Sequence, residues 1–375
     1  MELTNIRLGD YIERSTINNK ELKYGVDLIV GVNSQGVFAA PKGNTDGVDL
    51  KPYKIVENGA FVYNPTRLEL GSIAYRTEGL CIVSHLYMVF YLTDEGKKII
   101  DPMWLYIYFR RSEFCREVKF RNFGSQRPEF NFNDMSDIVI PLPDIEIQKK
   151  YVDIYNAMLE NQKSYEYGLE DLKLACDAYI EDLKHGIHCK AIGPYVERHD
   201  VRNRTNEIKN VMGVSTSKEF REPTSKVNRN ELSNYKIVRP RQISFVQTTH
   251  NEKVFAYAFN NTEDDIVVTS VNEVFSVDED KLLPEYLCMF FNRTEFDRYA
   301  RFHSWGSARE TFTWDDLVKV EIPIADMKTQ KSIANIYKAY KERKAINDKL
   351  KAQIKDICPI LIKGSIEEAR KAKEA

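Results

Sequence analysis

The 375-residue sequence lacks the patterns that mark export, membrane insertion or disulfide cross-linking. No apolar run approaches the length of a membrane-spanning helix, and the first residues, MELTNIRLGDYIER, carry charges where a signal peptide needs an apolar core. The six cysteines form no CxxC pair and follow no regular spacing, which indicates reduced thiols. We therefore expect a cytoplasmic protein that folds without disulfides.

The sequence motifs of several enzyme classes are also missing. No GxGxxG turn is present to bind a nucleotide-containing cofactor, and no P-loop is present to bind ATP. Asn64-Pro65 is similar to the start of the NPPY-like motif of amino-methyltransferases, but Thr66-Arg67 replaces the rest of that motif. His185, His188 and Cys189 have the spacing of metal ligands without a second ligand cluster. We expect no catalysis, cofactor or metal in this chain.

A strong excess of charge of one sign is absent as well, because the formal net charge is −2. This balance does not exclude nucleic-acid binding, which needs a basic stripe on one face only. Two basic stretches predict either such stripes or ordinary solvated surfaces. One contains Arg110, Arg111, Arg116, Lys119, Arg121 and Arg127, and the other contains Arg198, Arg202, Arg204, Lys209, Lys218, Arg221, Lys226 and Arg229.

What the sequence does contain is an internal repeat. GSQRP, from Gly124, returns as GSARE, from Gly306, and the surrounding segments align without gaps at a constant offset of 182 residues. At the same offset FRRSEF matches FNRTEF, and YKIV at Tyr53 matches YKIV at Tyr235. The chain is therefore two copies of one unit, Met1 to Gly186 and Ile187 to Ala375.

Each copy predicts a mixed α/β (α+β) globular part followed by a long helix. Short β-rich runs such as GAFVYN and QISFVQT alternate with Gly, Pro and Asn, which is typical of strands and turns. Apolar residues at helical spacing predict one helix over 101–118 and another over 283–300. The division that follows is 1–143 and 187–325 for the globular parts, with long helices over 144–186 and from 326 to 375.

The two long helices have the apolar spacing of a coiled coil. Polar residues at core positions favour a specific register, and the simplest pairing within one molecule is antiparallel. The predicted seam consists of Tyr151, Ile154, Met158, Asn161, Tyr165, Gly168, Leu172, Ala175 and Tyr179 in the first helix, and Ile336, Tyr340, Arg343, Asn347, Leu350, Ile354, Ile357 and Leu361 in the second.

With these motifs in place, the chain resembles the specificity subunit of type I restriction-modification enzymes. YNPTRLELGSIAY, from Tyr63, resembles a strand segment of that family, and GSQRPEFNFNDMSDIVIPLPDIEIQKK resembles its glycine-serine loop, proline turn and helix start. The sequence departs from the family pattern at Ile147 and Thr329, where an acidic residue is usual. The first copy contains an Asn-Pro-x-Arg (NPxR) segment, NPTR from Asn64, whereas the second copy offers NYKIVRPRQISFV in its place.

The resemblance implies two target recognition domains, over 1–143 and 187–325, that read a bipartite, gapped sequence of double-stranded DNA. It also implies docking to two methyltransferase subunits that use S-adenosylmethionine, and to restriction and translocase subunits that use ATP and Mg²⁺. Two alternatives stay open. One is a coiled-coil interaction scaffold that does not bind DNA, and the other is a silent or exchangeable specificity subunit.

The expected DNA contacts centre on the repeated loops. Arg127 and Arg309 have the chemistry to bind phosphate or guanine, or else each pairs with a nearby carboxylate, Asp134 or Asp316, in a structural turn. The expected DNA-binding set is Gly124, Ser125, Gln126, Arg127, Gly306, Ser307, Arg309, Lys42, Arg67, Gln247 and Thr248. The residues expected to contact partner subunits, or else simply to be solvated, are Tyr155, Tyr165, Tyr167, Tyr337 and Lys341.

Overall fold

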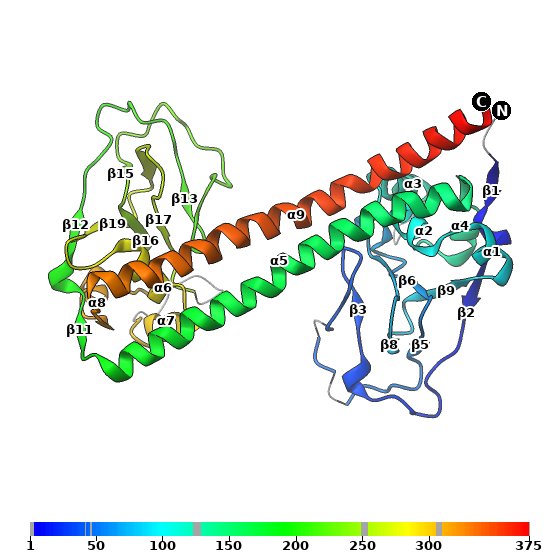
Figure 1. The fold of residues 1–375 in the computed structure, drawn as a ribbon, viewed down its shortest axis with the longest axis horizontal. Helices are drawn as coiled ribbons and strands as arrows, with labels where there is room; N and C mark the ends of the chain where they lie inside the picture. The colour runs from blue at the N-terminus through cyan, green and yellow to red at the C-terminus, as the bar shows by residue number, and fades with distance from the viewer. Residues whose placement is uncertain are drawn as a thin grey trace. The chain divides into compact units, whose positions relative to one another are not determined.

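The computed structural model describes residues 4–41, 43–45, 47–122, 129–248, 254–304 and 310–374, which form two compact units (Figure 1). Unit 1 comprises Met1–Ser164 and Asn347–Ala375, and unit 2 comprises Tyr165–Ile346. The long helices α5 (Ile145–Gly186) and α9 (Met327–Glu374) each contribute one part to each unit. The compact units therefore do not coincide with the two sequence copies.

Unit 1 is built around a four-stranded antiparallel sheet with the order β2-β9-β6-β7. Three two-stranded pairs, β1-β10, β3-β4 and β5-β8, flank it. The strands are β1 (Asn5–Arg7), β2 (Ile12–Ser15), β3 (Gly31–Val32), β4 (Phe38–Ala39), β5 (Lys54–Val56), β6 (Phe61–Tyr63), β7 (Ile73–Tyr75), β8 (Cys81–Val83), β9 (Met88–Leu92) and β10 (Val139–Pro141). The shorter helices are α1 (Asp94–Ile99), α2 (Pro102–Phe109), α3 (Ser112–Arg121) and α4 (Phe132–Ser136).

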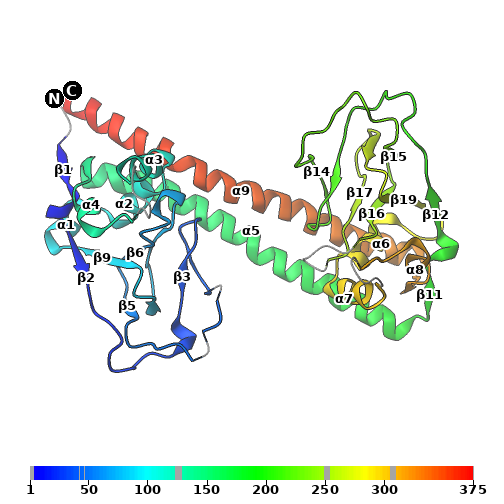
Figure 2. The same cartoon turned by 180° about the vertical axis from the view of Figure 1, so that it is seen from behind.

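Unit 2 repeats this topology, with the sheet order β12-β19-β16-β17 and the pairs β11-β20, β13-β14 and β15-β18 (Figure 2). Its strands are β11 (Cys189–Ala191), β12 (Val196–His199), β13 (Gly213–Val214), β14 (Phe220–Arg221), β15 (Lys236–Val238), β16 (Ile243–Val246), β17 (Tyr257–Phe259), β18 (Ile266–Val268), β19 (Asn272–Val277) and β20 (Glu321–Pro323). Its helices are α6 (Pro284–Phe291), α7 (Thr294–Phe302) and α8 (Trp314–Leu317). The mixed architecture and the internal repeat predicted from the sequence are confirmed.

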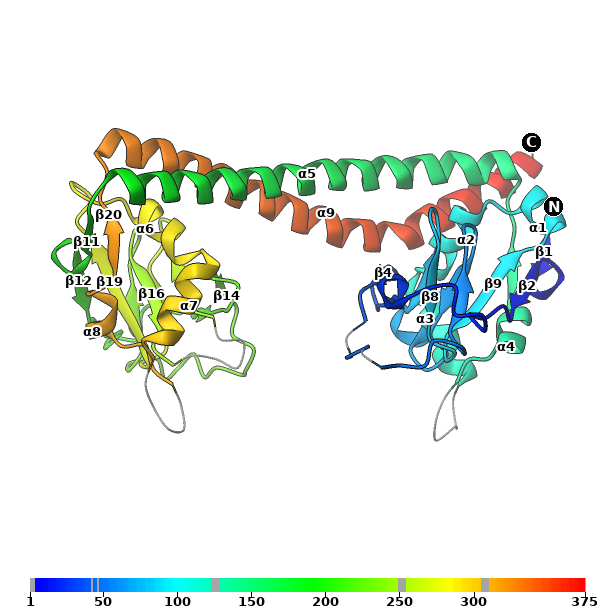
Figure 3. The same ribbon diagram turned by 90° about the horizontal axis from the view of Figure 1, so that it is seen from below.

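The predicted helices over 101–118 and 283–300 are each broken in two, which corrects the sequence interpretation. Arg111 and Arg293 have extended backbone, with ψ of 146° and 148°, and they separate α2 from α3 and α6 from α7. The break turns the second helix so that its first phenylalanine packs on the last one of the preceding helix. The ring centroids of Phe109 and Phe114 are 4.9 Å apart. In unit 2 the ring centroids of Phe291 and Phe296 are likewise 4.7 Å apart. Helix α7 lies beside the sheet of that unit (Figure 3).

A buried glutamine anchors the start of each long helix to its globular part. Gln148 donates to the carbonyl oxygens of Ile99 and Pro143 at 2.8 and 2.7 Å and accepts from the Asp101 amide. In unit 2, Gln330 makes the same three bonds, to residues 182 positions further along. Both glutamines are fully buried. Removing either would leave buried backbone groups unpaired, so these bonds fix where each helix begins.

The long helices are antiparallel within each unit, as predicted for their simplest pairing within one molecule. In unit 1 Lys150 pairs with Glu368 at 2.9 Å, and Gln162 donates to Asn347 at 2.9 Å. In unit 2 the guanidinium of Arg343 lies directly against Gly168, where a Cβ would overlap it. Arg343 and Asn347, two of the polar positions predicted in the seam of α9, therefore do contact α5.

The seam predicted on α5 is partly wrong. Ile154, Asn161 and Tyr179 are exposed, whereas their neighbours Tyr155, Gln162 and Ile180 are buried. The buried face of α5 is displaced by one residue because this helix packs on the globular part of each unit as well as on α9. Tyr155 and Ile180 belong to the cores of units 1 and 2.

Several absences concern the described part of the chain. No helix there is long and apolar enough to cross a bilayer. The six cysteines are unbonded, and four of them are buried. No group of three or more His, Cys, Asp or Glu side chains among the described residues is arranged to hold a metal ion.

Candidate nucleic-acid interface

In unit 1 the end of strand β6 lies against the segment that follows the GSQRP loop. The amide of Phe130 donates to the carbonyl oxygen of Pro65 at 3.0 Å. Asn64 accepts bonds from the amide and hydroxyl of Thr66 at 3.1 and 2.9 Å, which fixes a tight turn. This turn leaves the side chain of Arg67 exposed, just before the short helix η3 (Leu68–Leu70). Arg67 and the base of the repeated loop are therefore close together.

Unit 2 has the same arrangement at the end of β16. The amide of Phe312 donates to the carbonyl oxygen of Gln247 at 2.8 Å, and Thr248 forms a β-bridge with Thr311. Gln247 is thus the structural counterpart of Pro65, 182 residues earlier. This corrects the placement of NYKIVRPRQISFV as the counterpart of the NPxR segment, because its YKIV part forms β15.

The two strand ends differ in charge. In unit 2 the carboxylate of Glu273, which is 4% exposed, accepts two bonds of 2.8 Å from Arg198 and one from the side-chain Nε2 of Gln247. The ammonium of Lys236 lies 3.5 Å from the same carboxylate. Hydrogen bonding to Glu273 raises the pKa of Arg198. Cations therefore neutralise this buried carboxylate and keep it from repelling an approaching anion.

Unit 1 places other groups at the same end of its sheet. Lys54, the counterpart of Lys236, donates to the carbonyl oxygen of Tyr87 at 2.5 Å. Burial, followed by the nearby charge of Arg14, lowers the pKa of Lys54. The same backbone scaffold thus carries a turn followed by an exposed arginine in unit 1 and a carboxylate-centred network in unit 2. Such differences on one scaffold suit two surfaces that recognise different sequences.

Comparison with known proteins decides what this duplicated scaffold is. Residues 2–166 and 194–356 both match the model of the type I restriction modification DNA specificity domain. The chain belongs to this family. It is a DNA specificity subunit of a type I restriction-modification system.

The fold is shared with a solved S subunit of a type I restriction-modification system. The S subunit from M. genitalium is 11% identical, with a TM-score of 0.61, over 98% of this chain and 96% of that one. The HsdS subunit from Thermoanaerobacter tengcongensis is 14% identical, with a TM-score of 0.38, over 97% and 96% of the two chains. No curated protein matches the chain.

Many of the DNA contacts predicted for this specificity subunit lie outside the described residues and stay predictions. They are Lys42, Gly124, Ser125, Gln126, Arg127, Gly306, Ser307 and Arg309. The carboxylates proposed as alternative partners of the two loop arginines have other bonds. Asp134 accepts from the amide of Asn131, and Asp316 from the amide of Thr313, in matching capping boxes.

Two of the basic residues in the predicted stripes are buried, and both are structural. Arg110 of unit 1 is 8% exposed and donates to the carbonyl oxygen of Gly71 at 2.5 Å. Gly36 and Gly71 have φ of +76° and +88°, and a Cβ at either would crowd the guanidinium. In unit 2 Lys218 is equally buried and donates to the carbonyl oxygen of Phe291 at 2.7 Å. Neither cation is available to DNA.

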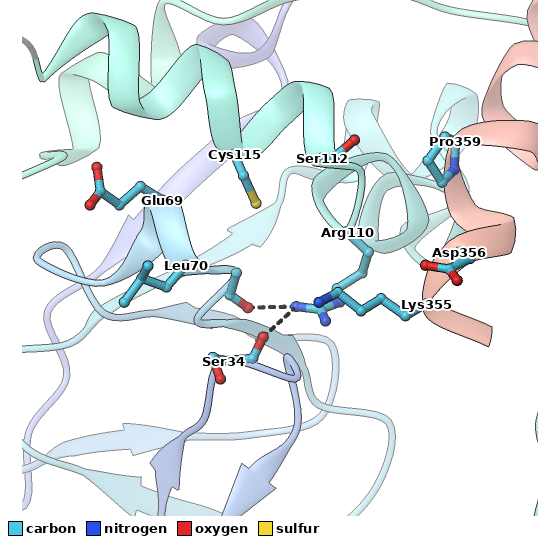
Figure 4. A pocket seen from close by; sticks show the side chains of 10 residues that line it. Ser34, Glu69, Leu70, Arg110, Ser112, Cys115, Lys355, Asp356 and Pro359 are labelled. Carbon is cyan, nitrogen blue, oxygen red and sulfur yellow. Dashed lines mark hydrogen bonds between the residues drawn. The ribbon is translucent and has the colours of Figure 1, made fainter. Parts of the chain in front are cut away.

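Arg110 forms one wall of a cavity of about 310 Å³ in unit 1 (Figure 4). Its lining combines acidic and basic side chains, and the guanidinium already bonds to backbone carbonyls (Figure 4). The lining residues are Ser34, Glu69, Leu70, Gly71, Arg110, Ser112, Cys115, Lys355, Asp356 and Pro359. Asn64 and Pro65 are not among these lining residues.

The residues predicted to contact partner subunits differ in how much of each side chain is exposed. Tyr155 and Tyr337 are only 4% and 8% exposed, since they belong to the hydrophobic cores, so little of either ring can reach a partner. Tyr165 carries the guanidinium of Arg343 over its ring at 4.9 Å, and Lys341 pairs with Glu219. Tyr167 is 72% exposed. Of the five, Tyr167 offers the largest surface to another subunit.

Sequence reasoning missed the network around Glu273. Its members come from strands β12, β15 and β19 and from Gln247, just after β16, and no local spacing connects them. Sequence reasoning also missed a pair of exposed phenylalanines, Phe120 and Phe302, although both lie in the aligned segments at the 182-residue offset. That offset was the signal that would have found them.

Proposed function

We propose that this specificity subunit reads a bipartite, gapped target in duplex DNA, with each unit addressing one half-site. The observation that carries the proposal is the duplicated strand end, where Phe130 bonds to Pro65 and Phe312 bonds to Gln247 in the same geometry. The side chains around these bonds differ between the units. Two copies of one scaffold with unlike polar groups suit two unlike half-sites.

We further propose that this chain is not itself a catalyst and acts in the cytoplasm, where it has access to genomic DNA. Two methyltransferase subunits would bind S-adenosylmethionine and methylate adenine, and restriction subunits would use ATP and Mg²⁺ for translocation and cleavage. The exposed faces of α5 and α9, including Tyr167, are available for docking of these subunits.

Mapping modified bases in the source genome tests the proposal. Deleting the gene should abolish one bipartite, gapped adenine-methylation motif, and restoring the gene should return it. An unchanged methylation map would contradict the proposal and would favour a silent copy or a protein scaffold. The recovered motif also supplies the target duplex for binding experiments.

Replacing Arg67 by alanine should weaken duplex binding and lower its dependence on salt. A phosphate contact contributes about one unit to the slope of log K against log salt, so the slope should fall by roughly one. Lys97→Ala is the matched control, because Lys97 is also an exposed cation, with 61% of its side chain exposed. It lies on α1, which follows the last residue of β9, whereas the strand end before Arg67 pairs with the first residue of β9. Equal slopes for both variants would remove Arg67 from the interface.

A further inference from the structure

Helices α3 and α7 present the same unusual surface in the two units. Each buries one face in its core, through Phe114 and Val118 in α3 and through Phe296 and Ala300 in α7. The outward face of each carries two cations and a phenylalanine. These residues are Arg116, Lys119 and Phe120 in unit 1, and Arg298, Arg301 and Phe302 in unit 2.

The phenylalanines are among the most exposed apolar side chains of the protein. Phe120 is 82% exposed and Phe302 is 78% exposed. A single exposed apolar residue is common on protein surfaces and needs no explanation. Here, however, the exposed ring recurs at the 182-residue offset, although the flanking residues Glu117 and Tyr299 differ. The two units thus keep an outward-facing ring that lies outside the hydrophobic cores formed by the described residues.

The position of these rings connects them with the candidate nucleic-acid interface. Each lies at the end of its helix, immediately before the segment that contains the repeated glycine-serine motif. In unit 1 the short helix η3, which follows Arg67, packs against α3. The spacing of Arg116, Lys119 and Phe120 at i, i+3 and i+4 puts all three on one side of the helix.

The charges beside the ring favour a polyanion as the occupant of this face. Arg116 and Arg298 are 74% and 77% exposed, and their ion pairs with Glu113 and Glu295, at 3.6 and 3.3 Å, are both solvent-exposed. Exposed pairs of this kind are weak, so either arginine can move to a phosphate at little cost. A single aromatic ring offers little apolar surface to a protein partner. In DNA, by contrast, the ring can stack on a base while the cations beside it bind the neighbouring phosphates.

We propose that Phe120 and Phe302 insert into the DNA duplex, one in each half-site, while Arg116, Lys119, Arg298 and Arg301 bind the adjacent phosphates. This inference rests on the proposed reading of two half-sites. Each ring stacks on a base and partly unstacks one base step. The energy needed to unstack that step depends on its sequence, so the rings also contribute to recognition, favouring flexible pyrimidine-purine steps.

Alanine substitution of each ring tests the inference with the purified full-length chain and the target duplex recovered from the methylation map. Phe120→Ala and Phe302→Ala should each weaken binding roughly 5-fold to 150-fold, the range expected for loss of one aromatic-base stack. Phe120→Leu should retain part of the affinity, because leucine also acts as a wedge. Ile360→Ala is the control, because Ile360 is 64% exposed but lies on α9.

A second readout separates insertion from simple contact. With 2-aminopurine placed at successive positions of the duplex, wild-type protein should raise fluorescence at one step in each half-site. Phe120→Ala should abolish the increase in one half-site only, and Phe302→Ala in the other only. Wild-type affinity and an unchanged fluorescence pattern in both variants would overturn the inference.

Two other outcomes have distinct meanings. If the variants bind DNA normally but no longer co-purify with the modification subunits, the rings are a protein-docking site and the inference is wrong. If wild-type protein does not distinguish the target duplex from a scrambled one, the proposed function itself fails, and the inference fails with it.

Discussion

Replacing Ile362 by aspartate is expected to lower the free energy of unfolding of unit 1 by about 4 kcal/mol or more. Ile362 is fully buried in the core of that unit, although it lies near the end of the chain. An aspartate there would lose the packing of the isoleucine and bury an unpaired carboxylate. Amide hydrogen exchange should show strong loss of protection in β6 and β9, whereas β16 and β19 of unit 2 keep theirs.

Ile360→Asp provides a matched control two residues away. Ile360 is 64% exposed, so the same charge at this position should change stability by no more than about 0.5 kcal/mol. Equal effects of the two substitutions, or equal loss of protection in both units, would contradict the assignment of this helix segment to the core of unit 1.

Replacing Lys218 by methionine should destabilise unit 2 by about 3 kcal/mol. The Lys218 ammonium lies 2.8 Å from the carboxylate of Asp297, and the two side chains are 7% and 17% exposed. Methionine fills a similar volume but leaves that carboxylate without its cation. Denaturant unfolding of the variant, followed by tryptophan fluorescence, measures the loss.

Adding Asp297→Asn to the Lys218→Met variant should recover part of the stability, because it removes the unpaired charge. Lys338→Met is the control, since Lys338 is 72% exposed and pairs with Glu342 at 3.9 Å, a contact expected to contribute less than about 0.5 kcal/mol. A Lys218→Met protein as stable as this control would show that the buried pair contributes no net stability.

The internal repeat made most of the architecture predictable. A constant offset between copies means that one set of strands and helices accounts for both units, and the matching bonds of Gln148 and Gln330 confirm how closely the copies correspond. The correspondence between the ends of strands β6 and β16 was harder to predict. Asn64-Pro65-Thr66 and Val246-Gln247-Thr248 share no motif, and their matching bonds from Phe130 and Phe312 confirm that they correspond at the 182-residue offset.

Other features depend on contacts that no local pattern records. Gly36 and Lys218 occupy equivalent positions, both with positive φ, yet in unit 1 the neighbouring buried cation is Arg110, supplied by the end of α2. In unit 2 the loop residue is itself the cation. Gly59 and Arg241 are related in the same way, and Arg241 is held by Glu279 and Glu285. Sequence alignment sees only a glycine replaced by a charge in each case.

Unit 1 is formed by two separate stretches of the chain, and this has a consequence for biosynthesis. Unit 2 is a continuous stretch, Tyr165–Ile346, whereas unit 1 needs Asn347–Ala375 to complete its core. At about 5 to 20 residues per second, the first globular part waits about 10 to 40 seconds on the ribosome for that segment. Unit 2 can therefore finish folding first, and the residues made earliest are among the last to reach their final packing.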